Sequence, residues 1–308
     1  MTLPKYAYFE GGIVPYSQAR VGVMTHALNY GTGAFAGVRG YWNEEEKQLY
    51  LFRPADHYKR FLNSGRLLRS QLEFKPEDLV EITIELLRKE AYREDCYIRP
   101  LYYKAEEAIG VRLHDLQDEI TIFAIPFTRY IPNDTTTHVT FSSWRRVSDN
   151  AVPPRGKLTG AYVNSALIKS DAFYAGFDEA LVLNDDGHVS EGSAENFFMV
   201  RDGVVITPPL TANVLEGITR RTIMQVLREE MNLEVVEREI DRTEVFIAEE
   251  AFFCGTGVQV VAITEVDHRK VGDGKMGPIV GQLRKIYFDI VRAKNPKYRD
   301  WNVPVYDA

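Results

Sequence analysis

Short turn motifs divide this chain into brief strands, and they limit the folds that are open to it. Asp185-Asp186-Gly187 separates two strand-like runs, and Asp202-Gly203 separates two more. Asp-Gly sequences between apolar runs are strong signals for tight antiparallel hairpins. The second half of the chain is therefore expected to hold hairpins between helical segments, which is typical of α+β folds.

Local signals elsewhere predict a mixture of strands and helices. Strands are expected at 6–14, as a hairpin around Gly11-Gly12, and at 48–52, 97–103, 119–127 and 138–144. Helices are expected after an N-cap at Asp56, from Pro76, over 162–175 with Gly176 at the end, over 219–231, from Asp241 with Glu244, and around 279–290. The loop 128–137, with Pro132-Asn133-Asp134, is the best linker candidate. We therefore expect a small N-terminal domain over 1–127, an interdomain loop over 128–137 and a larger domain over 138–308.

Composition narrows the class of protein. The chain has 308 residues and a net charge of −7, which argues against a nucleic-acid binder, because phosphate backbones require a basic face. Its two cysteines, Cys96 and Cys254, are far apart and are interpreted as reduced, buried thiols of a cytoplasmic protein. The six histidines show no zinc-ligand spacing, so no metal site is expected. No targeting segment and no apolar run of about 18 residues is found.

Lys157 lies in a run of small residues, Arg155-Gly156-Lys157-Leu158-Thr159-Gly160-Ala161-Tyr162. A second run, from Ser190 to Phe198, contains Glu191 at the end of a predicted hairpin strand. A lysine, a phenol and a carboxylate are the groups that a pyridoxal-phosphate enzyme needs. The lysine binds the aldehyde as a Schiff base, the carboxylate keeps the ring nitrogen protonated and the phenol bonds the ring oxygen. Glu195 competes with Glu191 for the carboxylate role, and Glu191 is preferred.

A phosphate group needs amide donors and positive charge. The segment Leu215 to Arg220 enters a helix, so the amides of Ile218 and Thr219 are expected to point from its N-terminus. Gly255-Thr256-Gly257 is a second, weaker candidate for an anion-binding loop. Arg60 lies in a predicted helix beside Phe61 and could supply positive charge.

Taken in order, the motifs resemble those of the branched-chain-amino-acid aminotransferases, which are pyridoxal-phosphate enzymes of fold type IV. The resemblance covers nearly the whole chain and is carried by seven segments: His26 to Gly33, Tyr97-Ile98-Arg99-Pro100, the Lys157 run, Ser190 to Asn196, Thr207-Pro208-Pro209, Leu215 to Arg220 and Cys254 to Gly257. It implies an α+β fold with two domains, a small N-terminal α/β domain and a larger C-terminal domain with a β-barrel-like core, joined by a short loop. It also implies a homodimer, whose active site lies between the domains and borrows residues from a second subunit.

The same resemblance implies roles for individual residues. Lys157 would be the Schiff-base lysine and proton shuttle. The cofactor would be bound by Arg60, Lys157, Tyr162, Glu191, Leu215, Gly217, Ile218, Thr219 and Thr256. The substrate would meet Tyr30 from the neighbouring subunit, Phe35, Tyr97, Arg99, Tyr130, Thr256 and Gly257. In this set Tyr97, Thr256 and Gly257 would take the α-carboxylate, and Arg99 the distal carboxylate of glutamate or 2-oxoglutarate.

The expected reaction is a ping-pong transfer of the amino group of L-leucine, L-isoleucine or L-valine to 2-oxoglutarate. Tyr97 and Arg99 fit the branched-chain enzymes, whereas D-amino-acid transaminases usually carry Arg-x-His there. Ala36, Phe127 and Gly257 depart from the commonest family pattern, which puts the substrate range in question. A D-amino-acid or amine transaminase, and an aminodeoxychorismate lyase, remain alternatives of the same fold. A phosphate-ligand binding protein without catalysis is the distant alternative.

Overall fold

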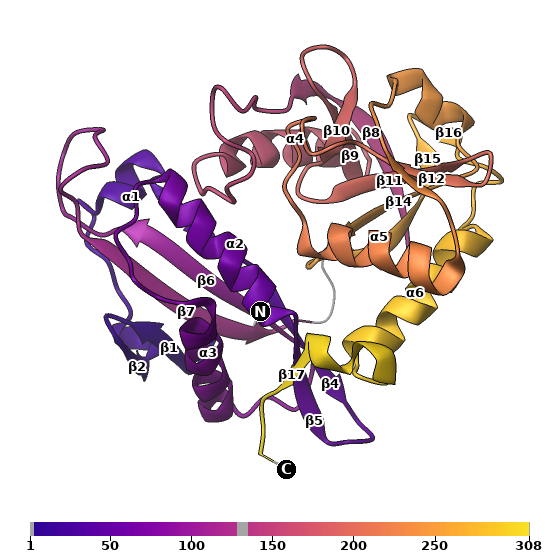
Figure 1. Cartoon of the computed structure of the whole chain (residues 1–308). Helices are drawn as coiled ribbons and strands as arrows, with labels where there is room; N and C mark the ends of the chain where they lie inside the picture. Colours follow the sequence, from indigo (N-terminus) through magenta and orange to yellow (C-terminus); the bar gives the residue numbers. More distant parts are fainter. Residues whose placement is uncertain (1–2, 128–134, 308) are drawn as a thin grey trace. The chain divides into compact units, whose positions relative to one another are not determined.

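The structure is a computed structural model that describes residues 3–127 and 135–307 (Figure 1). The chain divides into two compact units. The first unit consists of Met1–Thr128, Gly156–Gly160 and Asp289–Ala308, and the second of Arg129–Arg155 and Ala161–Phe288. The predicted domain division differs from these units in two segments, because the Lys157 loop and the C-terminal segment belong to the first unit. As a division into domains it stays a prediction.

The first unit is built on an eight-stranded sheet in the order β17-β5-β4-β6-β7-β1-β2, with β3 pairing with β6. Its strands are β1 (Tyr6–Phe9), β2 (Gly12–Pro15), β3 (Gly33–Phe35), β4 (Val38–Asn43), β5 (Gln48–Phe52), β6 (Cys96–Lys104), β7 (Asp118–Pro126) and β17 (Asn302–Pro304). Its helices are α1 (His26–Tyr30), α2 (Pro54–Leu67) and α3 (Pro76–Glu90), with 3₁₀ helices η1 (Tyr16–Gln18) and η3 (Pro296–Trp301). The strand pairings of this sheet are antiparallel, as the hairpin signals predict.

Helices α2 and α3 pack on each other through buried aromatic and hydroxyl groups. Within α2 the rings of Tyr58 and Phe61 meet edge-on at 6.2 Å, and the Tyr58 hydroxyl bonds the Thr83 hydroxyl of α3. The start of α3 is as predicted, since Pro76 is its first residue and Asp78 accepts a 2.7 Å bond from the Lys75 amide. The predicted N-cap of α2 at Asp56 is wrong.

Arg53 is the N-cap of α2 and Pro54 is its first residue. A proline suits the first helical position, because its fixed φ is helical and its missing N–H would have no partner there. Asp56 instead lies inside the first turn, where it forms a 2.7 Å ion pair with Arg53.

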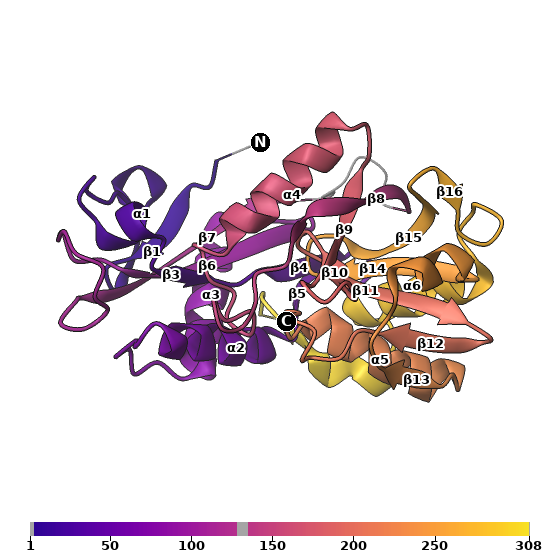
Figure 2. The ribbon, with the colours of Figure 1, turned by 90° about the horizontal axis from the view of Figure 1, so that it is seen from above.

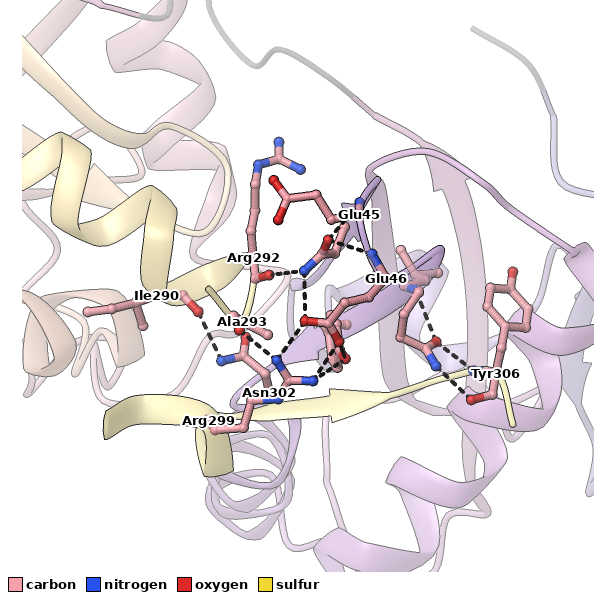
Figure 3. A network of polar contacts seen from close by, with 12 residues as sticks. Glu45, Glu46, Ile290, Arg292, Ala293, Arg299, Asn302 and Tyr306 are labelled. Atoms are coloured by element: carbon pink, nitrogen blue, oxygen red, sulfur yellow. Dashed lines mark hydrogen bonds and ion pairs between the residues drawn. The ribbon is translucent and has the colours of Figure 1, made fainter. Parts of the chain in front are cut away.

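A polar network holds the C-terminal segment to the β4–β5 hairpin (Figure 3). Arg299 binds the Glu46 carboxylate at 2.6 and 2.8 Å, and this contact lowers the pKa of Glu46 to about 2. Lys294 pairs with Glu45 at 2.5 Å. The buried Asn302 amide donates to the Ile290 carbonyl at 2.9 Å. These contacts explain why the last residues group with the start of the chain.

The second unit is built on a nine-stranded sheet in the order β10-β9-β8-β15-β14-β11-β12-β13, with β16 pairing with β15. Its strands are β8 (Thr136–Arg145), β9 (Glu179–Leu183), β10 (Val189–Gly192), β11 (Asn196–Arg201), β12 (Val204–Thr207), β13 (Val235–Glu237), β14 (Glu250–Gly255), β15 (Gln259–Val266) and β16 (Arg269–Lys270). Its helices are α4 (Tyr162–Tyr174), α5 (Ile218–Met231), the 3₁₀ helix η2 (Arg242–Ile247) and most of α6 (Pro278–Val291). The sheet is mixed, because β8 runs parallel to both of its neighbours.

Both faces of the second sheet are covered, and β9 illustrates how. Leu181 and Leu183 point into a large apolar core, whereas Ala180 and Val182 pack against Ile168 of α4. This alternation is the period of two that a strand imposes on its side chains. Helix α4 contacts β8 and β9, and α5 contacts β13 and β14, so the two helices cover different parts of the sheet (Figure 2).

The predicted turns and helices of the second unit are largely confirmed. Asp202 and Gly203 both have positive φ between β11 and β12, as the hairpin signal requires. The predicted helix at Asp241 is only the short 3₁₀ helix η2, and Asp241 makes no side-chain cap. The predicted loop 128–137 lies outside the described residues up to 134, and β8 already begins at Thr136. No helix among the described residues is long and apolar enough to cross a membrane.

Candidate active site

The loop that carries Lys157 is fastened to the first unit on both sides. The Phe35 amide donates to the Lys157 carbonyl at 2.9 Å, and the Lys157 amide donates to the Ser64 hydroxyl at 3.1 Å. Ser64 in turn donates to the carbonyl of Arg60 one turn earlier in α2. The backbone of Lys157 is therefore tied to β3 and, through Ser64, to the helix that carries Arg60.

Glycines make this fastening possible. A Cβ on Gly31 would lie 2.9 Å from the Cα of Gly160, and the φ of Gly31 is +66°. The Thr159 hydroxyl also bonds the Gly31 carbonyl, at 2.8 Å. The lack of a side chain at Gly31 and Gly160 thus allows these two backbone segments to lie against each other.

The side chains of Lys157 and Arg99 meet the same aromatic ring. The Lys157 Nζ lies 5.1 Å from the centre of the Phe35 ring, and the Arg99 guanidinium lies 4.4 Å from it. Arg99 also donates to the Tyr97 hydroxyl at 3.1 Å. Tyr97 and Arg99 share one face of β6 because they are two residues apart on a strand. An amine, a guanidinium, a phenol and an apolar ring are thus gathered in one place.

In the second unit, the carboxylate of Glu191 is buried and accepts several bonds. Arg146 pairs with it at 2.5 Å, the Asn196 amide donates at 2.9 Å and the Leu215 amide donates at 3.2 Å. Glu191 is 2% exposed. Hydrogen bonds and a guanidinium favour the ionised form of a buried carboxylate. These donors therefore suit a Glu191 that carries negative charge.

Glu195, the competing carboxylate, lies in a different environment. Its Oε2 accepts from the Ala194 amide at 3.0 Å, while its Oε1 is buried with no hydrogen-bond partner among the described residues. Burial, followed by the negative charge of Glu179, raises the pKa of Glu195 well above its usual range. A carboxyl group that keeps its proton cannot supply the negative charge that a ring nitrogen requires.

The N-terminus of α5 is open in the way that a phosphate site requires. Gly217 is the N-cap, with no side-chain cap and no acid in the first turn. A Cβ on Gly217 would lie 2.0 Å from the Asn196 Oδ1, so only glycine fits beside this amide. Ile218 and Thr219 are the first residues of the helix, and both are buried. Amide groups in the first turn of a helix have no partner within the helix, and together with the helix dipole they favour an anion at this point.

The other predicted residues are placed as follows. Tyr162 begins α4, and Thr256 and Gly257 form the turn between β14 and β15. The Tyr30 hydroxyl accepts a 3.0 Å bond from the Gly110 amide of its own chain. Tyr130 lies outside the described residues.

Three positions depart from the commonest family pattern, and the structure places one of them, Phe127, beside Tyr97. Ala36 is fully buried and bonds the Pro100 carbonyl through its amide. The Phe127 ring lies 5.4 Å from the Tyr97 ring. Gly257, the third, lies in the turn after β14.

Three residues that position these groups were missed from the sequence. They are Ser64, which bonds the Lys157 amide, and Arg146 and Asn196, which hold Glu191. Arg146 lies two residues beyond the predicted strand 138–144, and Asn196 lies in one of the family motifs, yet neither position indicates a partner by itself. Cys96 and Cys254 are free and buried, as predicted, and burial raises the pKa of both thiols.

Comparison with known proteins places the chain in a family. The family model for class IV amino-transferases matches residues 35–266. A probable branched-chain-amino-acid aminotransferase from Aquifex aeolicus is 46% identical over 302 residues, which cover 98% of this chain and 97% of the relative.

Solved structures agree in fold. The branched-chain aminotransferase of Thermoproteus uzoniensis, crystallised with norvaline, matches with a TM-score of 0.94 at 38% identity, covering 98% of this chain and 100% of that one. The enzyme of Thermobaculum terrenum in its PLP form matches with a TM-score of 0.94 at 39% identity, covering all of both chains. The predicted fold type is therefore confirmed. The chain belongs to the class IV aminotransferases, the family that its motifs resemble.

Proposed function

We propose that this enzyme transfers the amino group of L-leucine, L-isoleucine or L-valine to 2-oxoglutarate with pyridoxal 5'-phosphate as cofactor. The full-length similarity to branched-chain aminotransferases supports this activity. The observation in this structure that carries the proposal is the Phe35 ring with the amine of Lys157 on it at 5.1 Å and the guanidinium of Arg99 at 4.4 Å. This arrangement brings together an amine that can transfer protons (Lys157), an apolar surface (Phe35) and a cation that can bind a carboxylate (Arg99).

The residues fit the cofactor chemically. When bound, pyridoxal phosphate supplies an aldehyde that condenses with amines and a charged ring that withdraws electrons from the substrate α-carbon. Lys157 would be the lysine that binds this aldehyde. Glu191, whose carboxylate accepts bonds from Arg146, Asn196 and the Leu215 amide, would hold the proton on the ring nitrogen. Tyr162 would bond the ring oxygen. The amides of Ile218 and Thr219, together with Leu215, Gly217, Thr256 and Arg60, hold the remaining polar groups and the phosphate.

In the reaction, Lys157 performs the proton transfers. Its amine accepts the proton that leaves the α-carbon of the amino acid and releases it again later in the same half-reaction. Tyr97, Thr256 and Gly257 bind the substrate α-carboxylate. The amino acid and the 2-oxo acid use the same site in turn, so the kinetics are ping-pong.

The two substrates differ in their side chains, and Arg99 with Phe35 can accommodate both. An apolar chain needs no polar partner and packs on the ring. The distal carboxylate of 2-oxoglutarate requires a charged partner once it leaves water, and Arg99 supplies it. We expect Arg99→Met to raise KM for 2-oxoglutarate by roughly tenfold or more, since a charge-assisted bond contributes about 1.5–3 kcal/mol. KM for L-leucine should change much less, and equal effects on both would contradict this role.

The central test is Lys157→Ala, measured by turnover of L-leucine with 2-oxoglutarate. We expect turnover to be abolished, together with the visible absorption of the bound cofactor. Lys89→Ala is a matched control, because Lys89 is an exposed residue of α3 whose ammonium lies 3.9 Å from the exposed Glu85 carboxylate. Substantial turnover by Lys157→Ala would remove the assignment. Glu191→Gln should lower kcat more than it changes KM, and an unchanged kcat would redirect the role to Glu195.

Substrate trials separate the alternatives of the same fold. Turnover of D-alanine but not L-leucine would indicate a D-amino-acid enzyme, and turnover of amines alone an amine transaminase. Turnover of aminodeoxychorismate with no acceptor would indicate the lyase. A colourless protein that cannot be reconstituted with pyridoxal phosphate would favour a binding protein without catalysis.

The proposal includes a homodimer, in which Tyr30 reaches the partner's substrate site. Apolar side chains are unusually exposed near Tyr30, in two segments of the first unit. They are Val21 (51% exposed), Val23 (83%), Leu28 (63%), Ile109 (75%) and Val111 (77%). Exposed apolar groups of this density are typical of interaction surfaces. We expect a dimer mass by light scattering, and Val23→Asp to weaken it; a monomer with full activity would contradict the dimer. A cytoplasmic location stays a prediction that rests on the two free thiols.

A further inference from the structure

Three side chains that commonly bind metals lie together in the second unit, apart from every residue given a catalytic role. They are His138, Glu265 and His268, and their ligand atoms all lie within 4.8 Å of one another. His138 and Glu265 are partly buried and His268 is exposed, so an ion could reach them from solvent. The sequence gives no hint of this cluster, because the histidines are far apart along the chain.

The fold places the three residues by backbone contacts. His138 of β8 and Glu265 of β15 are direct neighbours across a parallel pair of strands. His268 lies in the turn between β15 and β16, where Asp267 and His268 both have positive φ, of 48° and 60°. Two successive left-handed residues form the tight turn that joins antiparallel strands. The geometry of this turn therefore fixes the position of the His268 backbone.

The imidazole rings are held in place, yet one polar atom has no hydrogen bond. Phe177 packs on both rings, at 4.6 Å from His138 and 4.8 Å from His268. The Nε2 of His138 is buried and has no hydrogen-bond partner among the described residues. Its nearest charged neighbour is the Glu265 Oε2 at 3.5 Å, which is too long for a strong hydrogen bond. A buried polar atom in this state calls for an explanation.

We propose that His138, Glu265 and His268 bind one divalent transition-metal ion, of which Zn²⁺ is the best fit. Two imidazoles and a carboxylate form a donor set that zinc accepts, with water in the fourth position. Metal–ligand distances of about 2.1 Å put the ligands of a tetrahedral ion roughly 3.4 Å apart. The 3.5 Å between His138 and Glu265 already matches this spacing. Only the exposed His268 must move, by up to roughly 1.4 Å, which is the difference between the largest separation of 4.8 Å and the tetrahedral spacing. The bound ion would join β8, β15 and the β15–β16 turn.

A second cluster, formed by Asp186, His188 and Glu239, is a poorer candidate. It contains a single imidazole. Asp186, Glu239 and Asp241 surround that ring, at 3.3, 3.8 and 3.6 Å. The bond to Asp186 and these negative charges raise the pKa of His188, which favours the protonated ring. A proton on the ring nitrogen competes directly with a metal.

The test is calorimetric titration of the holoenzyme, free of any histidine tag, with ZnCl₂. We expect one zinc ion per chain and a rise in Tm with zinc concentration, because a ligand that binds only the folded state stabilises it. His268→Asn should weaken binding by roughly tenfold or more. Asparagine tolerates the left-handed backbone of this turn, so the substitution removes the imidazole without adding strain. Glu265→Gln keeps the shape of the side chain and should weaken binding similarly.

Two further variants serve as controls. His114→Asn removes an exposed histidine outside both clusters, and His188→Asn removes the histidine of the second cluster. Both should bind zinc as the parent does. The visible absorption of the cofactor should stay unchanged during the titration, which separates this site from any binding of zinc at the cofactor. The proposal is overturned by an absence of saturable binding, by binding that survives both Glu265→Gln and His268→Asn, or by binding that His188→Asn abolishes.

Discussion

The contact between Asn196 and Glu191 offers a sharp test of the proposed charge at Glu191. The Asn196 Nδ2 donates to the Glu191 Oε2 at 2.9 Å and to the Leu215 carbonyl at 3.0 Å. Asn196 is 6% exposed and Glu191 2% exposed, so water screens neither. Asn196→Asp keeps the shape of the side chain but replaces the donor with an oxygen that both acceptors repel.

The size of the effect follows from two contributions. Loss of two buried hydrogen bonds, one of them to a charged group, costs about 2–3 kcal/mol. Two unit charges about 4 Å apart repel by about 4 kcal/mol at an effective dielectric constant of 20. When the new Asp carboxyl takes up a proton, this repulsion is relieved, and the carboxyl can again donate a hydrogen bond to Glu191. We therefore expect Asn196→Asp to lower the free energy of unfolding by about 6 kcal/mol at pH 8, where the new carboxyl is ionised, and by only about 2–3 kcal/mol at pH 5, where it is protonated.

The sign of this pH dependence is fixed by the pKa of the introduced carboxyl. Burial beside a carboxylate raises its folded-state pKa above the unfolded value of about 3.9. The folded state therefore holds the proton more tightly than the unfolded chain does. Stability is fully present below the unfolded pKa and is lost as the pH rises through the folded pKa.

The assay is urea unfolding of the holoenzyme at pH 5, 6.5 and 8, with cofactor at a fixed excess. Asn196→Ala is the matched control, because it loses the same two bonds without adding a charge. The difference between the unfolding free energies of the two variants isolates the charge repulsion, because the titration of other groups contributes equally to both. If Asn196→Asp follows Asn196→Ala at every pH, Glu191 is not ionised in the folded protein, and the proposed role of Glu191 loses its physical basis.

Two further predictions concern the Lys157 loop and the second carboxyl group. Gly31→Ala adds a Cβ 2.9 Å from the Cα of Gly160 at a φ of +66°. The substitution should lower the free energy of unfolding, measured by calorimetry, by about 1–3 kcal/mol, and it should lower kcat. Gly11→Ala is the control, because Gly11 has a φ of +81° and nothing within 4 Å of its Cβ position, and it should leave kcat unchanged. Equal effects of the two substitutions on kcat would show that the packing of the Lys157 loop does not matter for catalysis. Glu195→Gln should make the protein more stable at alkaline pH, because burial raises the pKa of Glu195 and stability is lost as the pH rises through that raised value. The parent and Glu195→Gln unfolding energies should converge near pH 4, and parallel curves from pH 4 to 9 would contradict a buried neutral acid.

Features encoded by neighbouring residues could be predicted from the sequence. Helix α3 begins at Pro76 because the proline and the Asp78 contact to Lys75 lie within one turn. Tyr97 and Arg99 share a face because β6 alternates. The error at Asp56 arose where two local signals compete, since Pro54 fixes the start of α2 before the acid can cap it.

Features that depend on distant residues could not be predicted. The C-terminal segment joins the first unit through pairs such as Arg299 with Glu46, and nothing local to Arg299 indicates that partner. The fastening of Lys157 by Ser64 is of the same kind, because a serine inside a helix usually bonds its own backbone or water. The full motif order identified the family, whereas the contacts that hold each motif in place required the structure.

Glu191 and Glu195 show why residue type alone does not assign a chemical role. They lie four residues apart in one motif, and both are almost completely buried. Burial alone would push both toward the neutral form. At Glu191 this effect of burial is offset by Arg146 at 2.5 Å and by two amide donors. Glu195 has one donor, and its Oε1 has no partner among the described residues. The same side chain is therefore suited to carry charge at one position and a proton at the other. The partners of Glu191, which come from the residue after β8, from β11 and from the approach to α5, decide between the two.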